Sequence, residues 1–251
     1  MVNGEVTTID ELKRFGLKIA QPETGYRFSL DPLLLADFVS ILPEQGRTID
    51  LGAGSGIIPL ILCRKFPGTT AVGIESNGSM AELATRNVLQ NNLADLIEIR
   101  EHDVKHLKRE FPVSSFDCVV SNPPFRTPYS GKISPRAGRD TARHESTAGI
   151  ADFLAAAKYL VKPSGRIWFI YHPDRLQEFV HVASELNLSL LRIRMVHGNK
   201  TAPAKIFMAE LAKGRKGATE VLAPLIIFGD DGEYTDEARG ILGDATARTI
   251  T

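Results

Sequence analysis

Short apolar runs alternate with longer amphipathic segments along most of this 251-residue chain. Five runs have the length and composition of buried strands, at 48–53, 70–75, 96–100, 116–121 and 166–171. Segments with helical spacing follow them: 58–66 with Pro59 in its first turn, 76–90 capped by Ser76 or Asn77, 150–160, and 173–186. Strands that alternate with helices predict βαβ units and a mostly parallel sheet.

Two further strand-like runs, 188–196 and 204–211, are joined by a connector at 197–203. A connector this short predicts an antiparallel pair at one edge of the sheet. The pattern therefore predicts an α/β fold with a doubly wound, mostly parallel, seven-stranded sheet and an antiparallel edge strand. We expect residues 1–46 to form an N-terminal flank or lid, with a helix at 31–42. Residues 47–212 form the main domain, and residues 213–251 form a C-terminal extension with an acidic tail.

The composition is that of a soluble globular protein, with 43% hydrophobic and 24% charged residues. The N-terminus has no apolar signal-peptide core, and no apolar run approaches the length of a membrane span, so we expect a cytoplasmic protein with no membrane partner. Cys63 and Cys118 both lie in apolar runs and are expected to be reduced core thiols. Two cysteines offer neither a disulfide framework nor the spacing of a metal site, and we expect no metal.

The formal net charge is zero, but the charges are segregated along the chain. Residues 126–144 hold five Lys or Arg against one acid, and residues 192–216 hold seven against one. Residues 230–237 hold five acids and no base. Such runs are usually solvated faces, and here they also hint at a side that binds a polyanion.

The stretch IDLGAGSGI places Gly52, Gly54 and Gly56 directly after the first strand of the alternating pattern and before a helix. Ligands of doubly wound sheets bind at the carboxyl ends of strands, where glycines allow the backbone to approach them closely. The spacing is G-x-G-x-G, which differs from the dinucleotide motif, and no Walker-type Lys-Ser/Thr follows it. A tight turn without a ligand is the alternative.

Two acids follow the next strands. Glu75 ends the second strand, where a carboxylate can accept hydrogen bonds from both hydroxyls of a ribose. Asp103 follows the third strand, where it could accept a bond from the exocyclic amine of an adenine, although an ordinary loop aspartate is an equal alternative. Together with the glycine turn, these acids predict a site for an adenosine without phosphates.

The fourth strand ends in SNPPF, residues 121–125. Adjacent prolines cannot continue a strand because they have no N–H to donate and a fixed φ. The side-chain oxygen of Asn122 and the backbone carbonyl of Pro123 are two acceptors held at a fixed angle. Phe125 adds an aromatic face on which a base can stack, worth about 1–3 kcal/mol. The alternative is a turn without chemistry, since Asn and Pro are common turn residues.

These motifs, in this order, resemble those of the class I S-adenosylmethionine-dependent methyltransferases over roughly residues 27–212. The resemblance implies a Rossmann-like fold, S-adenosylmethionine as cofactor, and methylation of a planar nitrogen by the motif at 122–125. The delocalised lone pair makes such a nitrogen a poor nucleophile, and hydrogen bonds from both of its N–H groups to the two acceptors would favour a pyramidal, more electron-rich atom.

A narrower resemblance is to the bacterial enzymes that N6-methylate an adenine in the anticodon loop of a valine tRNA. Its stretches are GYRFSLDPLLLADFV, GAGSGIIPLIL, SNPPF with a later ARHE, KPSGRIWFIYHPDRL and APLIIFGDDGEYT. It implies that Phe28 and Asp31 lie at the methionine end of the cofactor. It also implies that the rest of the cofactor is surrounded by Asp50, Gly52, Gly54, Gly56, Glu75 and Asp103, with Asn122 also beside the cofactor. Asn122, Pro123 and Phe125 would hold the adenine, with Phe125 standing where many members have Tyr.

A tRNA substrate requires phosphate contacts that position it without reading its sequence. We expect these contacts from arginines of the loop at 122–149, namely Arg126, Arg136, Arg139 and Arg143. Three alternatives stay open: a protein glutamine N5-methyltransferase, a guanine N2-methyltransferase of ribosomal RNA, and a non-catalytic module that binds S-adenosylmethionine.

Overall fold

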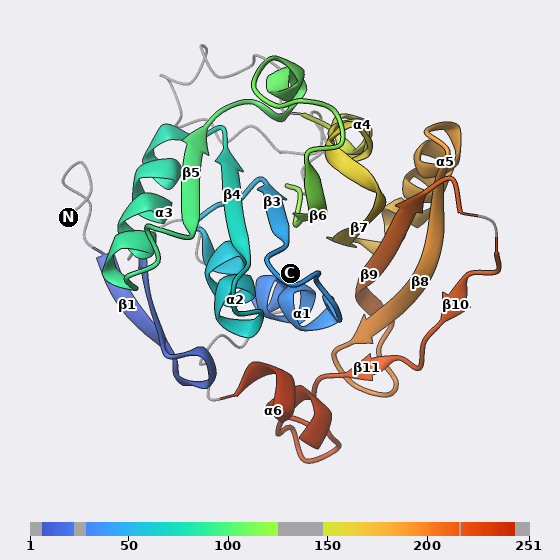
Figure 1. Ribbon diagram of the computed structural model, residues 1–251. Coiled ribbons are helices and arrows are strands. Elements are labelled where there is room, and N and C mark those ends of the chain that lie inside the picture. Colours follow the sequence, from blue (N-terminus) through green and yellow to red (C-terminus); the bar gives the residue numbers. More distant parts are fainter. Residues whose placement is uncertain (1–6, 23–28, 125–147, 216, 244–251) are drawn as a thin grey trace, which may run out of the picture.

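The computed structural model describes residues 7–22, 29–124, 148–215 and 217–243. All seven strands expected from the sequence are present in its main sheet (Figure 1). They are β3 Arg47–Leu51, β4 Thr70–Glu75, β5 Ile97–Glu101, β6 Phe116–Ser121, β7 Val161–Tyr171, β8 Leu188–His197 and β9 Ala204–Lys213. Two short strands that the sequence did not predict, β10 Glu220–Val221 and β11 Leu225–Ile226, pair with β8.

The strand order is β10-β8-β9-β7-β6-β3-β4-β5, with β11 beside β8. Strands β3 to β7 are parallel to one another, whereas β9 is antiparallel to both β7 and β8. The doubly wound, mostly parallel sheet with an antiparallel pair at one end is therefore confirmed. The antiparallel strand β9 lies one place in from β8, so its N–H and C=O groups are paired on both sides.

Helices cover both faces of this sheet. The helices are α1 Asp31–Phe38, α2 Ile57–Lys65, α3 Gly78–Gln90, α4 Ile150–Leu160, α5 Leu176–Glu185 and α6 Asp236–Leu242, with short 3-10 turns η1 Lys13–Phe15, η2 Val104–Arg109 and η3 Pro173–Arg175. Successive residues of a strand point to opposite faces. Accordingly Cys118 and Val120 of β6 join the core under α1 and α2, while Val119 between them joins the core under α4 and α5.

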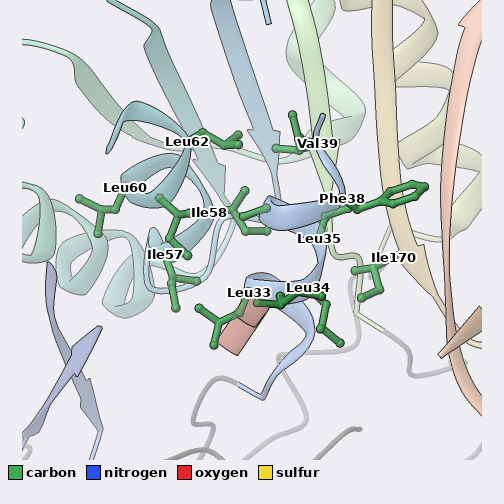
Figure 2. Packing of buried hydrophobic residues seen from close by; sticks show 14 of the residues in the cluster. Leu33, Leu34, Leu35, Phe38, Val39, Ile57, Ile58, Leu60, Leu62 and Ile170 are labelled. Carbon is green, nitrogen blue, oxygen red and sulfur yellow. The ribbon is translucent and has the colours of Figure 1, made fainter. Parts of the chain in front are cut away.

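The core under α1 and α2 is made of aliphatic side chains from both helices and from the sheet (Figure 2). Leu34 and Leu35 of α1 are at most 1% exposed, and Ile58 of α2 and Ile170 of β7 are similarly buried. Burying a side chain of this size stabilises the folded state by roughly 1.5–3 kcal/mol. This packing holds the start of α2, and hence the turn before it, against the sheet.

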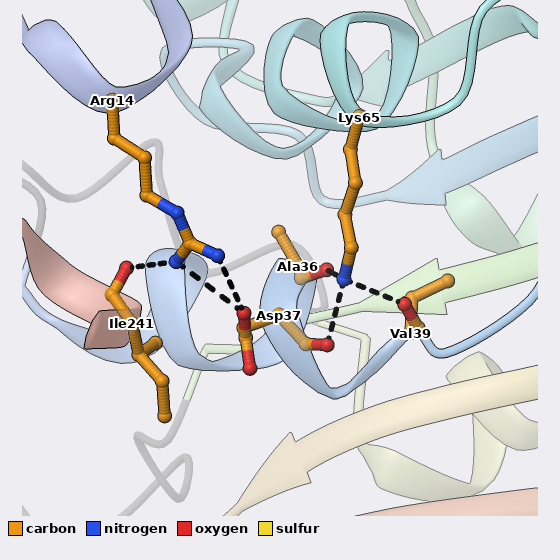
Figure 3. A network of polar contacts seen from close by, with 6 residues as sticks. All are labelled: Arg14, Ala36, Asp37, Val39, Lys65 and Ile241. Atoms are coloured by element: carbon orange, nitrogen blue, oxygen red, sulfur yellow. Dashed lines mark hydrogen bonds and ion pairs between the residues drawn. The ribbon is translucent and has the colours of Figure 1, made fainter. Parts of the chain in front are cut away.

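The segment expected as an N-terminal flank or lid contains a hairpin that the sequence did not predict. Its strands, β1 Thr7–Leu12 and β2 Leu17–Pro22, form a separate two-stranded sheet, which lies along α3. The helix expected over 31–42 ends at Phe38. There Lys65 Nζ donates to the carbonyls of Ala36, Asp37 and Val39, at 3.0, 2.8 and 2.8 Å (Figure 3). This cation satisfies carbonyls that a longer helix would have bonded itself.

Arg14, between the two hairpin strands, connects distant parts of the chain. Its guanidinium donates to the carbonyl of Ile241 in α6, at 2.6 Å, and to Asp37 Oδ1 in α1, at 3.4 Å (Figure 3). The N-terminal hairpin, α1 and the C-terminal helix therefore meet at one arginine. The domain boundaries at 46/47 and 212/213 stay a prediction.

β7 begins five residues before the strand expected at 166–171, so residues 162–165 lie inside it. Val161 pairs with Phe116 and Arg166 pairs with Cys118. Between these two pairs β7 contains more residues than β6. The extra residues form a bulge, a feature that apolar periodicity does not reveal. Across the described residues, we find no helix that is both long and apolar enough to cross a membrane.

Candidate cofactor and target site

The glycine turn joins β3 to α2 at the carboxyl edge of the sheet. Gly52, Gly54 and Gly56 have φ values of 80°, 54° and 78°. All three values lie in the left-handed region, which glycine adopts without the strain that other residues would suffer. The amides of Gly52 and Ala53 both donate to the carbonyl of Ile74, at 2.8 Å, so the turn folds over the end of β4.

The three glycines face different surroundings. A Cβ on Gly52 would lie 3.4 Å from the Phe153 ring, and one on Gly56 would lie 3.2 Å from the Cβ of Ala84. Both glycines therefore let a helix pack closely against the turn. A Cβ on Gly54 would meet no described atom within 4 Å. The space beside Gly54 is where a ligand can approach the backbone.

Glu75 braces this turn. Its Oε2 accepts from the Gly54 amide at 2.9 Å, and its Oε1 accepts from the Asn77 amide at 2.8 Å. Each carboxylate oxygen can accept a further hydrogen bond, so both remain available to donors of a ligand. The ribose contact expected of Glu75 stays a prediction, and the structure adds that the same side chain shapes the glycine turn.

Asp103 caps the 3-10 turn that follows β5. Its Oδ1 accepts from the Lys105 amide at 2.9 Å. The amide of His102 donates to the carbonyl of Glu75 at 2.9 Å, which keeps the ends of β4 and β5 side by side. Asp103 and Glu75 therefore lie at neighbouring strand ends. The expected contact of Asp103 with an adenine amine stays a prediction.

Asp50 is 1% exposed, and neither carboxylate oxygen has a hydrogen-bond partner among the described residues. Burial raises the pKa of this carboxyl well above its usual value, and the charge of Glu75 raises it further. Burial, with the Asp50 charge as a smaller cause, also raises the pKa of the Cys118 thiol on the adjacent strand. An unpartnered buried carboxyl destabilises the folded state. A ligand donor could relieve that cost. Asp31 is fully buried in the first turn of α1.

Asn122 follows β6, and the hydroxyl of Ser121 before it donates to the carbonyl of Leu51 at 2.7 Å. This bond ties the end of β6 to the residue that precedes the glycine turn. Asn122 Oδ1 is buried and has no partner within the part of the chain that the structure describes. Pro123 and Pro124 have no N–H and cannot supply one. The site thus holds an open acceptor beside the glycine turn.

Several expected site residues lie outside the described residues, namely Phe28, Phe125, Arg126, Arg136, Arg139 and Arg143. Their roles stay predictions. Among the described residues, no three His, Cys, Asp or Glu side chains are grouped so that they could hold a metal ion.

The second basic segment, 192–216, is less available to a polyanion than its charge count suggested. Arg194 pairs with Glu237 at 2.6 Å, and Lys200 pairs with Asp230 at 3.4 Å. Arg192 pairs with Glu210 at 2.5 Å. Two of these acids belong to the acidic tail, so part of the segregation seen along the sequence is cancelled in space.

Asn87 of α3 contacts the glycine turn but was not among the residues predicted from the sequence. Its side chain is fully buried and donates to the carbonyl of Ser55 in the glycine turn, at 3.0 Å. An asparagine on the apolar face of an amphipathic helix was the available signal, because such residues are disfavoured there unless the side chain has partners.

Residues 32–200 match the family described as "Methyltransferase small domain". The chain is 31% identical to the tRNA1(Val) (adenine(37)-N6)-methyltransferase of Porphyromonas gingivalis, over 92% of both chains. It is 26% identical to the protein of that name from Vibrio campbellii, over 86% of both. Its fold matches a crystal structure described as a predicted O-methyltransferase from Agrobacterium tumefaciens, with a TM-score of 0.68, 21% identity, and coverage of 84% of this chain and 94% of that one.

Proposed function

The chain belongs to the methyltransferase small domain family, and we propose that it transfers a methyl group from S-adenosylmethionine to the exocyclic N6 of an adenine in the anticodon loop of a tRNA. It is an S-adenosylmethionine-dependent methyltransferase with a Rossmann-like class I fold. The names of its relatives support the adenine and the tRNA. The single observation that carries the chemistry is the Oδ1 of Asn122, which is buried and has no partner among the residues that the structure describes.

The residues at the carboxyl edge of the sheet fit the cofactor. Gly54 offers open space against the backbone, and Glu75 and Asp103 place carboxylates at the next two strand ends. Asp50 offers two buried oxygens with no partner among the described residues, which suits the ammonium group of the ligand, so we assign Asp50 together with Asp31 to the methionine end. When bound, S-adenosylmethionine supplies a methyl group that its sulfonium already activates. The methylated nitrogen is then a cationic, acidic amine whose extra proton water can accept, so the protein needs no strong general base.

The task left to the protein is to orient and activate the amine. Asn122 Oδ1 accepts one N–H of the adenine amine, and the carbonyl of Pro123 accepts the other. Two acceptors at a fixed angle favour a nitrogen whose lone pair is directed out of the ring plane. Because Pro123 is buried and has a fixed φ, the angle is set before the substrate arrives.

Residues beyond the described part of the chain complete the proposal. Phe125 stacks on the adenine after the base has turned out of its loop. Arg126, Arg136, Arg139 and Arg143 contact RNA phosphates near the anticodon. The ion pairs of Arg192, Arg194 and Lys200 leave this role mainly to the arginines of 126–143.

Methylation of purified tRNA from cells that lack the gene tests this function. The tRNA is incubated with the protein and S-adenosylmethionine, digested to nucleosides and analysed by mass spectrometry. We expect N6-methyladenosine to appear only when active protein and tRNA are both present. Methyl transfer to guanine N2 would contradict the proposal. The proposal would also be contradicted if a cell extract incubated with the protein and labelled S-adenosylmethionine gained a methyl label on protein glutamine, and if ribonuclease treatment did not remove that label.

A further inference from the structure

Asn87 of α3 uses all of the hydrogen-bonding capacity of its amide group. Its Oδ1 accepts from the Ala20 amide at 2.8 Å and from Gln90 Nε2 at 3.2 Å. Its Nδ2 donates to the carbonyl of Ala20 at 3.1 Å and to the carbonyl of Ser55 at 3.0 Å. A primary amide has two N–H donors and an oxygen with two lone pairs, so no capacity is left over.

Asn87 and Asn91 together act as a neighbouring strand for β2. Asn87 bonds both the N–H and the C=O of Ala20, as a strand residue would. Asn91, one helical turn later, does the same for Lys18: its Oδ1 accepts at 2.9 Å and its Nδ2 donates at 2.7 Å. The spacing of four in the helix matches the spacing of two in the strand, because about one turn of helix spans about two strand residues.

Of the two asparagines, Asn87 also reaches the glycine turn. The turn is held from one side by Glu75, which accepts from Gly54, and from the other by Asn87, which donates to Ser55. Ala84, one turn before Asn87 on the same face of α3, packs where a Cβ on Gly56 would lie. Among the bonds of the described residues, the side chain of Asn91 is bonded to Lys18 and to the Asn87 carbonyl.

We propose that Asn87 is a positioning residue that couples the β1–β2 hairpin to cofactor binding through the glycine turn. The inference rests on the proposed function only in taking that turn as the site of S-adenosylmethionine. Asn87 contacts neither cofactor nor substrate and acts by fixing the carbonyl of Ser55. Coupling between two sites is reciprocal. Bound S-adenosylhomocysteine should therefore reduce the local opening of β2, and a change that loosens β2 should weaken the binding of S-adenosylhomocysteine.

A matched pair of variants, Asn87→Ala and Asn91→Ala, separates positioning from general stability. Both remove a pair of bonds to β2, but only the first frees the carbonyl of Ser55. We measure the dissociation constant of S-adenosylhomocysteine by calorimetry and Tm without ligand. We expect Asn87→Ala to weaken binding about tenfold, the effect of losing one buried hydrogen-bond partner, and Asn91→Ala to change it less than twofold. The Asn87 variant should also show a raised KM for S-adenosylmethionine with an unchanged kcat at saturation.

Equal affinity of the two variants, at similar losses of Tm, would overturn the inference. If Asn87→Ala does not fold, hydrogen exchange of the wild-type protein still tests the inference. Saturating S-adenosylhomocysteine should slow exchange of the Ala20 amide, and unchanged exchange across β2 would equally refute the coupling. If the wild type bound no S-adenosylhomocysteine, the proposed function would fail together with this inference. Failure of the variant or exchange tests alone would leave that function intact.

Discussion

The two turns at the carboxyl edge of the sheet, after β3 and after β6, differ in how their polar groups are satisfied. In the glycine turn, the Gly52 amide donates to Ile74, the Gly54 amide to Glu75, and the Ser55 carbonyl accepts from Asn87. In the Asn-Pro-Pro turn, Asn122 Oδ1 is buried with no partner among the described residues. These three groups of the glycine turn are bonded by residues of β4 and α3, whereas Asn122 Oδ1 has no such partner in the described part of the chain.

This difference indicates that the glycine turn serves cofactor binding and the Asn-Pro-Pro turn serves methyl transfer. A turn whose groups are already bonded presents a fixed surface, and changes in it should mainly alter how tightly the cofactor binds. An acceptor kept open beside that surface is satisfied only when a donor arrives, so changes in it should mainly alter turnover. Variants of residues in and around each turn test this separation.

Asn122→Ala should lower kcat about 10²- to 10³-fold on unmethylated tRNA, the usual effect of removing one preorganised polar group from a transition state. Binding of S-adenosylhomocysteine should change less than about twofold, because the glycine turn keeps its own partners. Turnover is measured with labelled S-adenosylmethionine and binding by calorimetry.

Asn122→Asp is the matched control, since it keeps an acceptor oxygen at the same place. It should retain more turnover than Asn122→Ala. If Asn122→Ala kept full turnover, or lost cofactor affinity as strongly as activity, the separation of the two turns would not hold.

Local signals were sufficient for the main sheet but not for the hairpin. The seven strands follow from apolar runs bounded by polar residues, and Asn77 caps α3 by accepting from the Met80 amide at 3.2 Å, as expected. The hairpin strand β2 is docked by Asn87 and Asn91, which lie 67 to 73 residues away in the chain. The pattern of apolar and polar residues within 17–22 gives no information about a partner so far away in the sequence.

The candidate site shows the same limit. Its members could be placed together from the sequence because parallel strands bring their carboxyl ends to one edge. The sequence could not reveal that Glu75 first bonds Gly54, or that Arg194 pairs with Glu237, 43 residues further on. Both contacts depend on where loops and extensions settle, which residue spacing does not determine.

Glu75→Ala should weaken S-adenosylhomocysteine binding at least about tenfold and also lower Tm, because the amides of Gly54 and Asn77 lose their acceptor. Glu101→Ala is the matched control: Glu101 pairs in register with Glu75 at the end of β5 but is exposed. It should change affinity less than about twofold. Equal effects of the two variants would show that general charge near the strand ends, and not the brace on the glycine turn, sets affinity.

Asp50 also belongs to the proposed cofactor side, but its carboxylate oxygens have no partner among the described residues. Burial raises the pKa of its carboxyl in the folded state. As the pH rises through about 4, the unfolded chain loses this proton before the folded protein does. The unfolded state then binds fewer protons, so this group makes the free energy of unfolding fall as pH rises from about 4 toward the folded-state pKa.

Asp50→Asn should remove that contribution, since the amide stays neutral at every pH. Without ligand, the variant should have a Tm about 2–4 °C above wild type at pH 8, the shift that about 1 kcal/mol gives in a chain of this size, and the difference should vanish near pH 4. Saturating S-adenosylhomocysteine should reverse the order at pH 8, because its ammonium group can pair with the wild-type carboxylate but not with the amide. Thermal unfolding at both pH values, with and without ligand, measures all four differences. A variant that stayed ahead of wild type with ligand bound would place Asp50 among the core residues and outside the cofactor site.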